Sequence, residues 1–299
     1  MKDLPAVPAP IAVARSTRLA DYVELAKLRL NALVIATSAA GYYLGATSRI
    51  DWWHMLAGVG GTAAVAAGAA ILNQVSERDT DALMRRTRLR PLPDGRVSLP
   101  EARTAGVVLL GVGLSMLAAR TNLAATALAA ATVIIYLAVY TPLKRRSPFA
   151  TLVGAVPGAL PPLIGWAASH GTVSIGGAAL FAIVFLWQIP HFMAIAWLYR
   201  DDYGKAGFPM LPVIEPDGKR TGRQAVMYSA ALLPVSLIPG LIGLTGSAYV
   251  AIAAALGMAL LILSVAFARS RTDAAARTLF FASIIYLPLI WAAMIADKI

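Results

Sequence analysis

Long apolar stretches without a charged residue recur along almost the whole chain, separated by short polar segments. Each is long enough to cross a hydrocarbon core of about 30 Å as a helix, the main way a single apolar segment can satisfy its backbone there. The pattern predicts an all-α integral membrane protein with about nine transmembrane helices around a central cavity. The expected spans are 31–48, 53–76, 103–119, 122–142, 149–168, 172–199, 224–243, 247–268 and 275–296.

The segment before the first span divides into two parts. Residues 1–17 are rich in Pro and Ala and are interpreted as a disordered cytosolic tail, so that 18–299 form a single membrane domain. In residues 19–30, apolar and basic positions recur at helical spacing, which predicts an amphipathic helix on the membrane surface. The alternative is a plain extension of the first span.

Composition supports a membrane protein and excludes several kinds of chemistry. Hydrophobic residues make up 59% of the chain and charged residues only 14%, against about 25% charged in a soluble domain. The absence of Cys removes thiol catalysis, disulfides and Cys-ligated metals. The net charge of +11 raises the question of nucleic acid, but the placement of the basic residues argues against it.

Basic residues gather on one side of the predicted topology. Of the 26 Lys and Arg residues, 23 fall in the N-terminal segment, in the loops after spans two, four, six and eight, or at the adjoining span ends. The opposite side keeps only Arg49, Arg120 and Lys298. The positive-inside rule therefore places the N-terminus in the cytosol and the C-terminus on the outer face.

The end of span two carries the strongest candidate for chemistry. Asn73, Glu77 and Asp81 follow one another at intervals of four residues, so on a helix they form one stripe. Polar groups at membrane depth usually line a cavity or site, and such oxygen ligands suit Mg²⁺ with substrate phosphates. Asp79 points about 160° away from Asp81 and has a lesser role. The alternative is that these acids only offset nearby arginines.

A second acidic cluster follows span six, at Asp201 and Asp202. Spans two and six run in the same direction, so both clusters lie on the cytosolic side and can face one cavity. The metal ligands expected from the two clusters together are Asn73, Glu77, Asp81, Asp201 and Asp202. Taken alone, the second cluster is also typical of an ordinary charged helix end.

Basic residues close to these acids are candidates for binding a diphosphate: Arg86, Arg90, Lys144, Arg145 and Lys205. Basic residues in such loops ordinarily serve only to set the orientation of the helices in the membrane. Carboxylates alone would repel a diphosphate, whereas a divalent cation between the two reverses the sign of the interaction. An amphiphile with a diphosphate head and an apolar tail fits this pattern, and metal and bases would stabilise the departing diphosphate.

These motifs resemble those of the UbiA superfamily of intramembrane prenyltransferases, whose first acidic motif N-x-x-x-[DE]-x-x-x-D matches Asn73, Glu77 and Asp81. Within it, the chain most resembles the protoheme IX farnesyltransferase family. The further matching segments are 79–96, 140–145, 158–166, 187–192 and 200–212. Two positions depart from the pattern: Lys27, Leu28 and Arg29 replace K-P-R, and the second acidic motif is a compact Asp pair.

The resemblance implies transfer of a farnesyl group from farnesyl diphosphate to the 2-vinyl group of haem B, giving haem O and diphosphate. It implies Mg²⁺ as cofactor, haem B as a substrate rather than a cofactor, and a multi-pass protein of the bacterial cytoplasmic (inner) membrane. Haem O supports terminal oxidase assembly, so contact with haem A synthase or oxidase assembly factors is also expected.

Three residues of span six are candidates for the acceptor cavity: His191, Trp187 and Gln188. The imidazole of His191 can ligate iron, line a polar cavity or donate a hydrogen bond to another helix. Trp187 can equally be packing.

Two other functions fit parts of the pattern. The first is prenyl transfer to another acceptor, for example 4-hydroxybenzoate. Only the resemblance to the protoheme IX farnesyltransferase family argues against it. A transporter also suits nine helices, but transporters place charged features near the midplane, whereas here the acids lie at helix ends.

Overall fold

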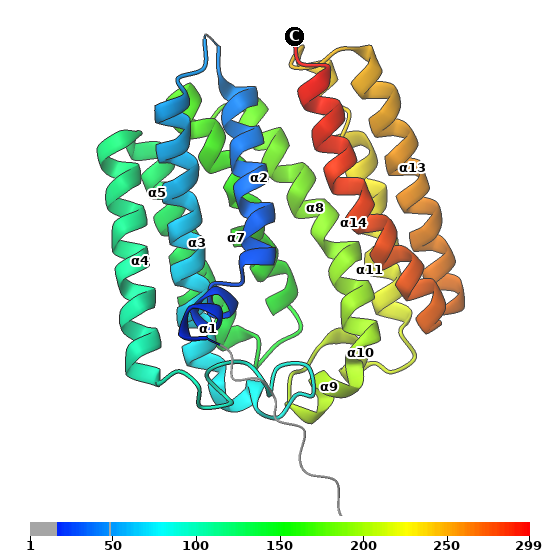
Figure 1. Cartoon of the computed structure of the whole chain (residues 1–299). Helices are drawn as coiled ribbons and strands as arrows, with labels where there is room; N and C mark the ends of the chain where they lie inside the picture. Colours follow the sequence, from blue (N-terminus) through cyan, green and yellow to red (C-terminus); the bar gives the residue numbers. More distant parts are fainter. Residues whose placement is uncertain (1–16, 48) are drawn as a thin grey trace, which may run out of the picture.

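The computed structural model describes residues 17–47 and 49–299, and in these residues the only β pairing is an isolated bridge between Thr245 and Lys298. The helices run in the following order (Figure 1): α1 Arg18–Leu25, α2 Leu28–Gly45, α3 Trp52–Asp81, α4 Leu99–Arg120, α5 Leu123–Val133, the π-helix η1 Ile134–Tyr140, α6 Thr141–Leu143, α7 Ala150–His170, α8 Ile175–Leu198, α9 Arg200–Lys205, α10 Leu211–Ile214, α11 Lys219–Val235, α12 Ile238–Leu241, α13 Ser247–Ser270 and α14 Asp273–Ala296.

Eight helical segments in the described residues are long and apolar enough to cross a membrane. They correspond to the second to ninth predicted spans, with shifts of a few residues at their ends. The first predicted span corresponds to α2, an 18-residue helix that lies beside α3 and α7. The predicted all-α, multi-pass membrane fold is therefore confirmed.

The N-terminal surface helix is shorter than the sequence pattern predicts. It is α1, which begins after the capping residue Thr17 and ends at Leu25. Lys27 then adopts a left-handed backbone conformation with φ of 49°, which turns the chain before α2 begins. The alternative of one continuous extension of the first span is therefore wrong. The predicted tail, residues 1–17, lies outside the described residues except for Thr17.

Two predicted spans contain interruptions that hydropathy does not reveal. The fourth changes from α5 to the π-helix η1, and π segments often occur at functional sites. The seventh ends as an α-helix at Val235, and α12 follows after a short turn. Pro234 and Pro239 flank this turn, and each lacks the N–H that would continue a regular helix.

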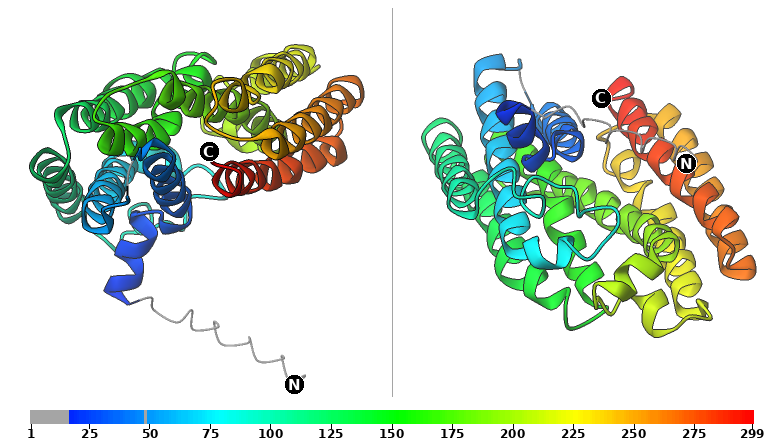
Figure 2. Two further views of the ribbon diagram at one scale, coloured as in Figure 1. Left: turned by 90° about the horizontal axis from the view of Figure 1, so that it is seen from above. Right: turned by 60° about the horizontal axis from the view of Figure 1, so that its bottom comes forward.

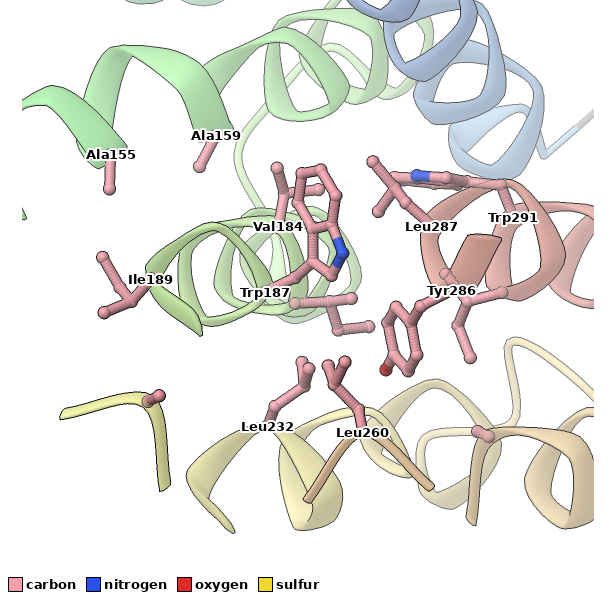
Figure 3. Close-up of a cluster of buried hydrophobic side chains, with 14 of the residues drawn as sticks. Ala155, Ala159, Val184, Trp187, Ile189, Leu232, Leu260, Tyr286, Leu287 and Trp291 are labelled. Atoms are coloured by element: carbon pink, nitrogen blue, oxygen red, sulfur yellow. The ribbon is translucent and has the colours of Figure 1, made fainter. Parts of the chain in front are cut away.

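The long helices run side by side in a ring when viewed along their axes (Figure 2). The closest approach joins α2 to α7, where a Cβ on Gly41 would overlap the carbonyl of Pro162 and one on Gly165 would overlap that of Ser38. Helices α8, α11, α13 and α14 share a core in which Trp187 of α8 packs towards Leu287 and Trp291 of α14 (Figure 3).

Candidate active site

The predicted stripe on α3 is present and buried. Asn73, Glu77 and Asp81 are 2%, 3% and 1% exposed, although they occupy the last turns of a long helix. Asp79 lies on the opposite face of the same helix and is exposed. Because buried carboxylates are costly without partners, the stripe requires cationic groups from other segments.

Lys144, which directly follows α6, supplies the first of these cations. Its Nζ lies 3.1 Å from Oε1 and 3.3 Å from Oε2 of Glu77. The ammonium group also lies 4.6 Å from the centre of the Phe208 ring. Burial opposes the charge on Lys144, but Tyr140 and Glu77 outweigh that effect, and the pKa of Lys144 is raised. Lys144 therefore stays charged at neutral pH.

Arg90 supplies the second cation. Its Nη1 donates to Oδ2 of Asp81 at 2.7 Å. The loop that carries Arg90 is folded back on the end of α3, since the Thr87 hydroxyl donates to the carbonyl oxygen of Asp81 at 2.7 Å. Both carboxylates of the stripe are thus paired with bases that the sequence also proposed as diphosphate ligands.

The inner end of the stripe is fixed by the π-helix. Asn73 donates through Nδ2 to Thr141 Oγ1 at 3.0 Å and accepts from the Tyr136 hydroxyl at 3.1 Å. The rings of Tyr136 and Tyr140 are stacked, with centres 5.5 Å apart. The irregular turn thus places two aromatic rings from η1 beside the polar stripe.

Lys27 is a site residue that the sequence reasoning missed. It is partly buried at the bend between α1 and α2, and the charges of Arg90, Glu77, Lys144 and Asp81 act on it. Burial, and after it the charge of the neighbouring Arg90, lower the pKa of Lys27 to about 8 against the raising effect of Glu77. The available signal was its place at the first position of the K-P-R pattern.

The second acidic cluster lies at the same end of the molecule as the first. Asp201 and Asp202 line a separate pocket of about 450 Å³ together with Arg85, Arg86, Leu198 and Tyr199. The guanidinium of Arg86 lies 5.0 Å from the centre of the Tyr199 ring, and its Nη2 donates to the Tyr203 hydroxyl at 3.4 Å. In the described residues, no three His, Asp or Glu side chains are close enough together to hold a metal ion.

The two remaining predicted diphosphate ligands differ in position. Arg145 donates through Nη2 to the carbonyl oxygen of Ser76 at 3.3 Å, so it borders the stripe on α3. Lys205, at the end of α9, is exposed. The structure thus brings Arg90 and Lys144 to the stripe and Arg86 to the second acidic pair, whereas Arg145 contacts the backbone of α3 beside the stripe.

The three predicted acceptor residues on α8 face two different helices. Gln188 donates to the carbonyl oxygen of Ala155 on α7 at 3.1 Å. Trp187 donates through Nε1 to the Ser283 carbonyl on α14 at 2.7 Å, and Nδ1 of His191 lies 2.8 Å from Ser283 Oγ. Trp187 and Gln188 are buried, whereas His191 is only partly buried.

Comparison with solved structures supports the fold. A digeranylgeranylglyceryl phosphate synthase superposes with a TM-score of 0.80 at 19% identity, covering 93% of this chain and 98% of the other. A UbiA homologue from Archaeoglobus fulgidus bound to GPP and Mg²⁺ superposes with a TM-score of 0.65 at 19% identity, covering 92% and 99%. Similarity at this level of identity establishes a shared fold.

Sequence relatives are closer. A protoheme IX farnesyltransferase from Solibacter usitatus is 43% identical over 93% of this chain and 98% of its own length. The enzyme of the same name from Opitutus terrae is 45% identical over 96% and 97%. The model of the UbiA prenyltransferase family matches residues 33–285. With the acidic stripe of that family in place on α3, the chain belongs to the UbiA prenyltransferase family.

Proposed function

We propose that this protein transfers the farnesyl group of farnesyl diphosphate to the 2-vinyl group of haem B, producing haem O and diphosphate. The relatives named protoheme IX farnesyltransferase match it over nearly their whole length. The structural observation that carries the proposal is the buried stripe in which Glu77 pairs with Lys144 and Asp81 pairs with Arg90. Such a charged site at the end of a membrane helix suits an anionic head whose tail is apolar.

The donor set of the stripe fits Mg²⁺. Glu77 and Asp81 offer carboxylate oxygens and Asn73 an amide oxygen, which are hard ligands of the kind that Mg²⁺ accepts alongside phosphate and water. These three residues would hold the ion, and Asp201 and Asp202 would hold a second ion in their own pocket beside Arg85 and Arg86. When bound, Mg²⁺ supplies positive charge that stabilises the departing diphosphate.

The chain's own bases hold the diphosphate. Lys27, Arg90 and Lys144 act around two carboxylates, so these five groups together carry a net positive charge that favours an anion. Arg90 suits two-pronged contact with phosphate oxygens, and Lys144 acts as a compact charge. Arg86, Arg145 and Lys205 bind the diphosphate from the rim.

The reaction begins as the C–O bond between farnesyl C1 and the diphosphate breaks, with both electrons leaving on the diphosphate. The haem vinyl group then forms a bond to C1, and water supplies the hydroxyl of the hydroxyethylfarnesyl chain with release of a proton. Bases held around the leaving group favour the first step because they stabilise charge that develops there. The stacked Tyr136 and Tyr140 rings favour an allylic cation through their π faces.

The acceptor haem lies against α8, beside His191, Trp187 and Gln188. Trp187 and Gln188 are held by hydrogen bonds to neighbouring helices, so they form a fixed wall. His191 is the more exposed of the three and is the polar group available to the acceptor.

We further propose that the end of the bundle carrying α1 and α9 faces the cytosol of a bacterium, in the inner membrane. The basis is the charge asymmetry between the two sets of loops. Residues 18–299 act as one domain, because a single core joins α2, α7 and α8 to α11, α13 and α14. Contact with haem A synthase or oxidase assembly factors stays a prediction.

Pigment analysis tests the proposal directly. The chain is expressed in a host lacking its own haem O, and extracted haems are separated and weighed by mass spectrometry. A farnesylated haem is expected. The purified protein with farnesyl diphosphate and Mg²⁺ should also prenylate haem B but not 4-hydroxybenzoate, and a chelator should stop the reaction. Prenylation of 4-hydroxybenzoate alone would replace the proposed acceptor.

A further inference from the structure

The hydrogen bonds around His191 determine which of its ring nitrogens carries the proton. The Ser283 hydroxyl donates its single proton to the carbonyl oxygen of Phe280, one turn earlier on α14, at 2.6 Å. With the hydroxyl turned to that carbonyl, Ser283 Oγ accepts the 2.8 Å hydrogen bond from His191 Nδ1. This arrangement assigns the proton to Nδ1 and leaves the lone pair on Nε2.

Nε2 is also free to use that lone pair. Among the described residues, no side chain or backbone group makes a hydrogen bond to it, and His191 is only partly buried while Ser283 and Trp187 are buried. A neutral imidazole whose Nδ1–H is fixed by an oxygen and whose Nε2 is open is the usual state of a histidine that ligates a metal.

The ring plane is fixed as well. The imidazole stacks on Trp187 with ring centres 5.3 Å apart and on Phe280 with centres 5.1 Å apart. Trp187 is in turn held by its bond to the Ser283 carbonyl, and it lies in the packed α8–α14 region shown in Figure 3. The hydrogen bond to Ser283 alone would not fix the plane of the imidazole ring, whereas two stacked rings do.

His191 and Asn73 lie a similar number of residues from the ends of their helices. His191 lies seven residues before the end of α8 at Leu198, and Asn73 lies eight before the end of α3 at Asp81. At 1.5 Å per residue each lies about 10–12 Å along its own helix from that helix's C-terminal end. A porphyrin bound at His191 would therefore lie at a similar distance from its helix end as the inner end of the stripe.

We infer that His191 binds the iron of the acceptor haem through Nε2, and that Ser283 is a positioning residue that fixes the tautomer. This inference rests on the proposed function, because it takes haem B as the acceptor. Its consequence is that the haem is oriented by its metal, so that a vinyl group is presented to the prenyl donor at a set height.

The test is spectroscopic and needs no turnover. Ferrous haem B is added to the purified full-length protein without farnesyl diphosphate, and the iron–histidine stretching band is recorded by resonance Raman. The chain has only three His residues. The band should be present in the wild type and in a His54→Ala, His170→Ala double variant, be lost in His191→Ala, and return when imidazole is added.

Ser283→Ala should keep the band but shift it, because the Nδ1–H···O hydrogen bond that tunes the ligand is lost. If Ser283 had only a structural role, the frequency of the band would not change in Ser283→Ala. Absence of the band in the wild-type complex overturns the inference without relying on any variant. Persistence of the band in His191→Ala also overturns it. If the wild type still makes haem O in either case, the proposed function stands; if it makes none, that function fails by itself.

Discussion

Lys144 Nζ and Glu77 Oε1 lie 3.1 Å apart, although 67 residues separate them, and both side chains are largely buried at 13% and 4% exposure. A buried carboxylate and a buried ammonium each depend on the other, because removing one leaves an uncompensated charge. The pair therefore joins the stripe on α3 to the segment after α6 and makes the site one unit.

Neutralising either carboxylate of the stripe should abolish most activity. Glu77→Gln and Asp81→Asn keep side-chain size but remove the charge that holds the metal. The expected loss in kcat/KM is about 100-fold or more, the scale seen when one group that stabilises transition-state charge is removed. Haem O formation by purified protein over a Mg²⁺ titration measures it. Asp79→Asn, on the exposed face of the same helix, is the matched control and should stay active.

Normal Mg²⁺-dependent turnover in Glu77→Gln or Asp81→Asn would count decisively against the assigned site. Equal loss in Asp79→Asn would instead show that the helix end responds to charge in general. A melting temperature for each variant in detergent separates lost chemistry from lost folding.

Removing the Lys144 ammonium should weaken diphosphate binding. Lys144→Ala is expected to raise the KM for farnesyl diphosphate about tenfold, since a hydrogen bond to a charged group contributes about 1.5 kcal/mol or more. Steady-state kinetics at saturating haem measure it. Lys144→Arg should recover part of the affinity, and Lys219→Ala, at an exposed lysine, should leave KM unchanged. Unchanged kinetics in Lys144→Ala would remove this residue from the site.

The fold and the first acidic cluster were readable from the sequence because both depend on local pattern. Uncharged runs identify membrane helices, and a four-residue interval places Asn73, Glu77 and Asp81 on one face whatever surrounds the helix. The pairing of Glu77 with Lys144 and of Asp81 with Arg90 was not readable. It depends on how a loop and a π-helix fold back, which no periodicity encodes.

Lys27 was missed for a related reason. A lysine near the cytosolic end of a span is expected as a topology signal, and only the left-handed bend after α1 turns it towards the stripe. The same limit applies to Asp201 and Asp202. The direction of the helices predicted that they lie at the same end of the bundle as the stripe. Their pocket with Arg85 and Arg86 depends on tertiary packing, which the sequence does not reveal.

The close contact between α2 and α7 should be intolerant of added volume. In Gly165→Ala the new methyl group overlaps the Ser38 carbonyl, so the helices must separate. Overpacking of this kind typically costs about 1–3 kcal/mol, and the melting temperature in detergent should fall. Gly111→Ala is the matched control, because a Cβ there meets nothing within 4 Å. A Gly165→Ala protein as stable as Gly111→Ala would show that α2 and α7 adjust freely.

The lowered pKa of Lys27, about 8, gives diphosphate binding a pH dependence whose direction can be predicted. Below that pH the ammonium is charged and attracts the diphosphate, and above it the neutral amine does not. The KM for farnesyl diphosphate should therefore be flat at lower pH and rise above about pH 8, by up to about tenfold per unit. Lys27→Arg should remove this rise, since a guanidinium stays charged. A wild-type KM that is constant from about pH 7 to pH 9, or an identical rise in Lys27→Arg, would place the titrating group elsewhere.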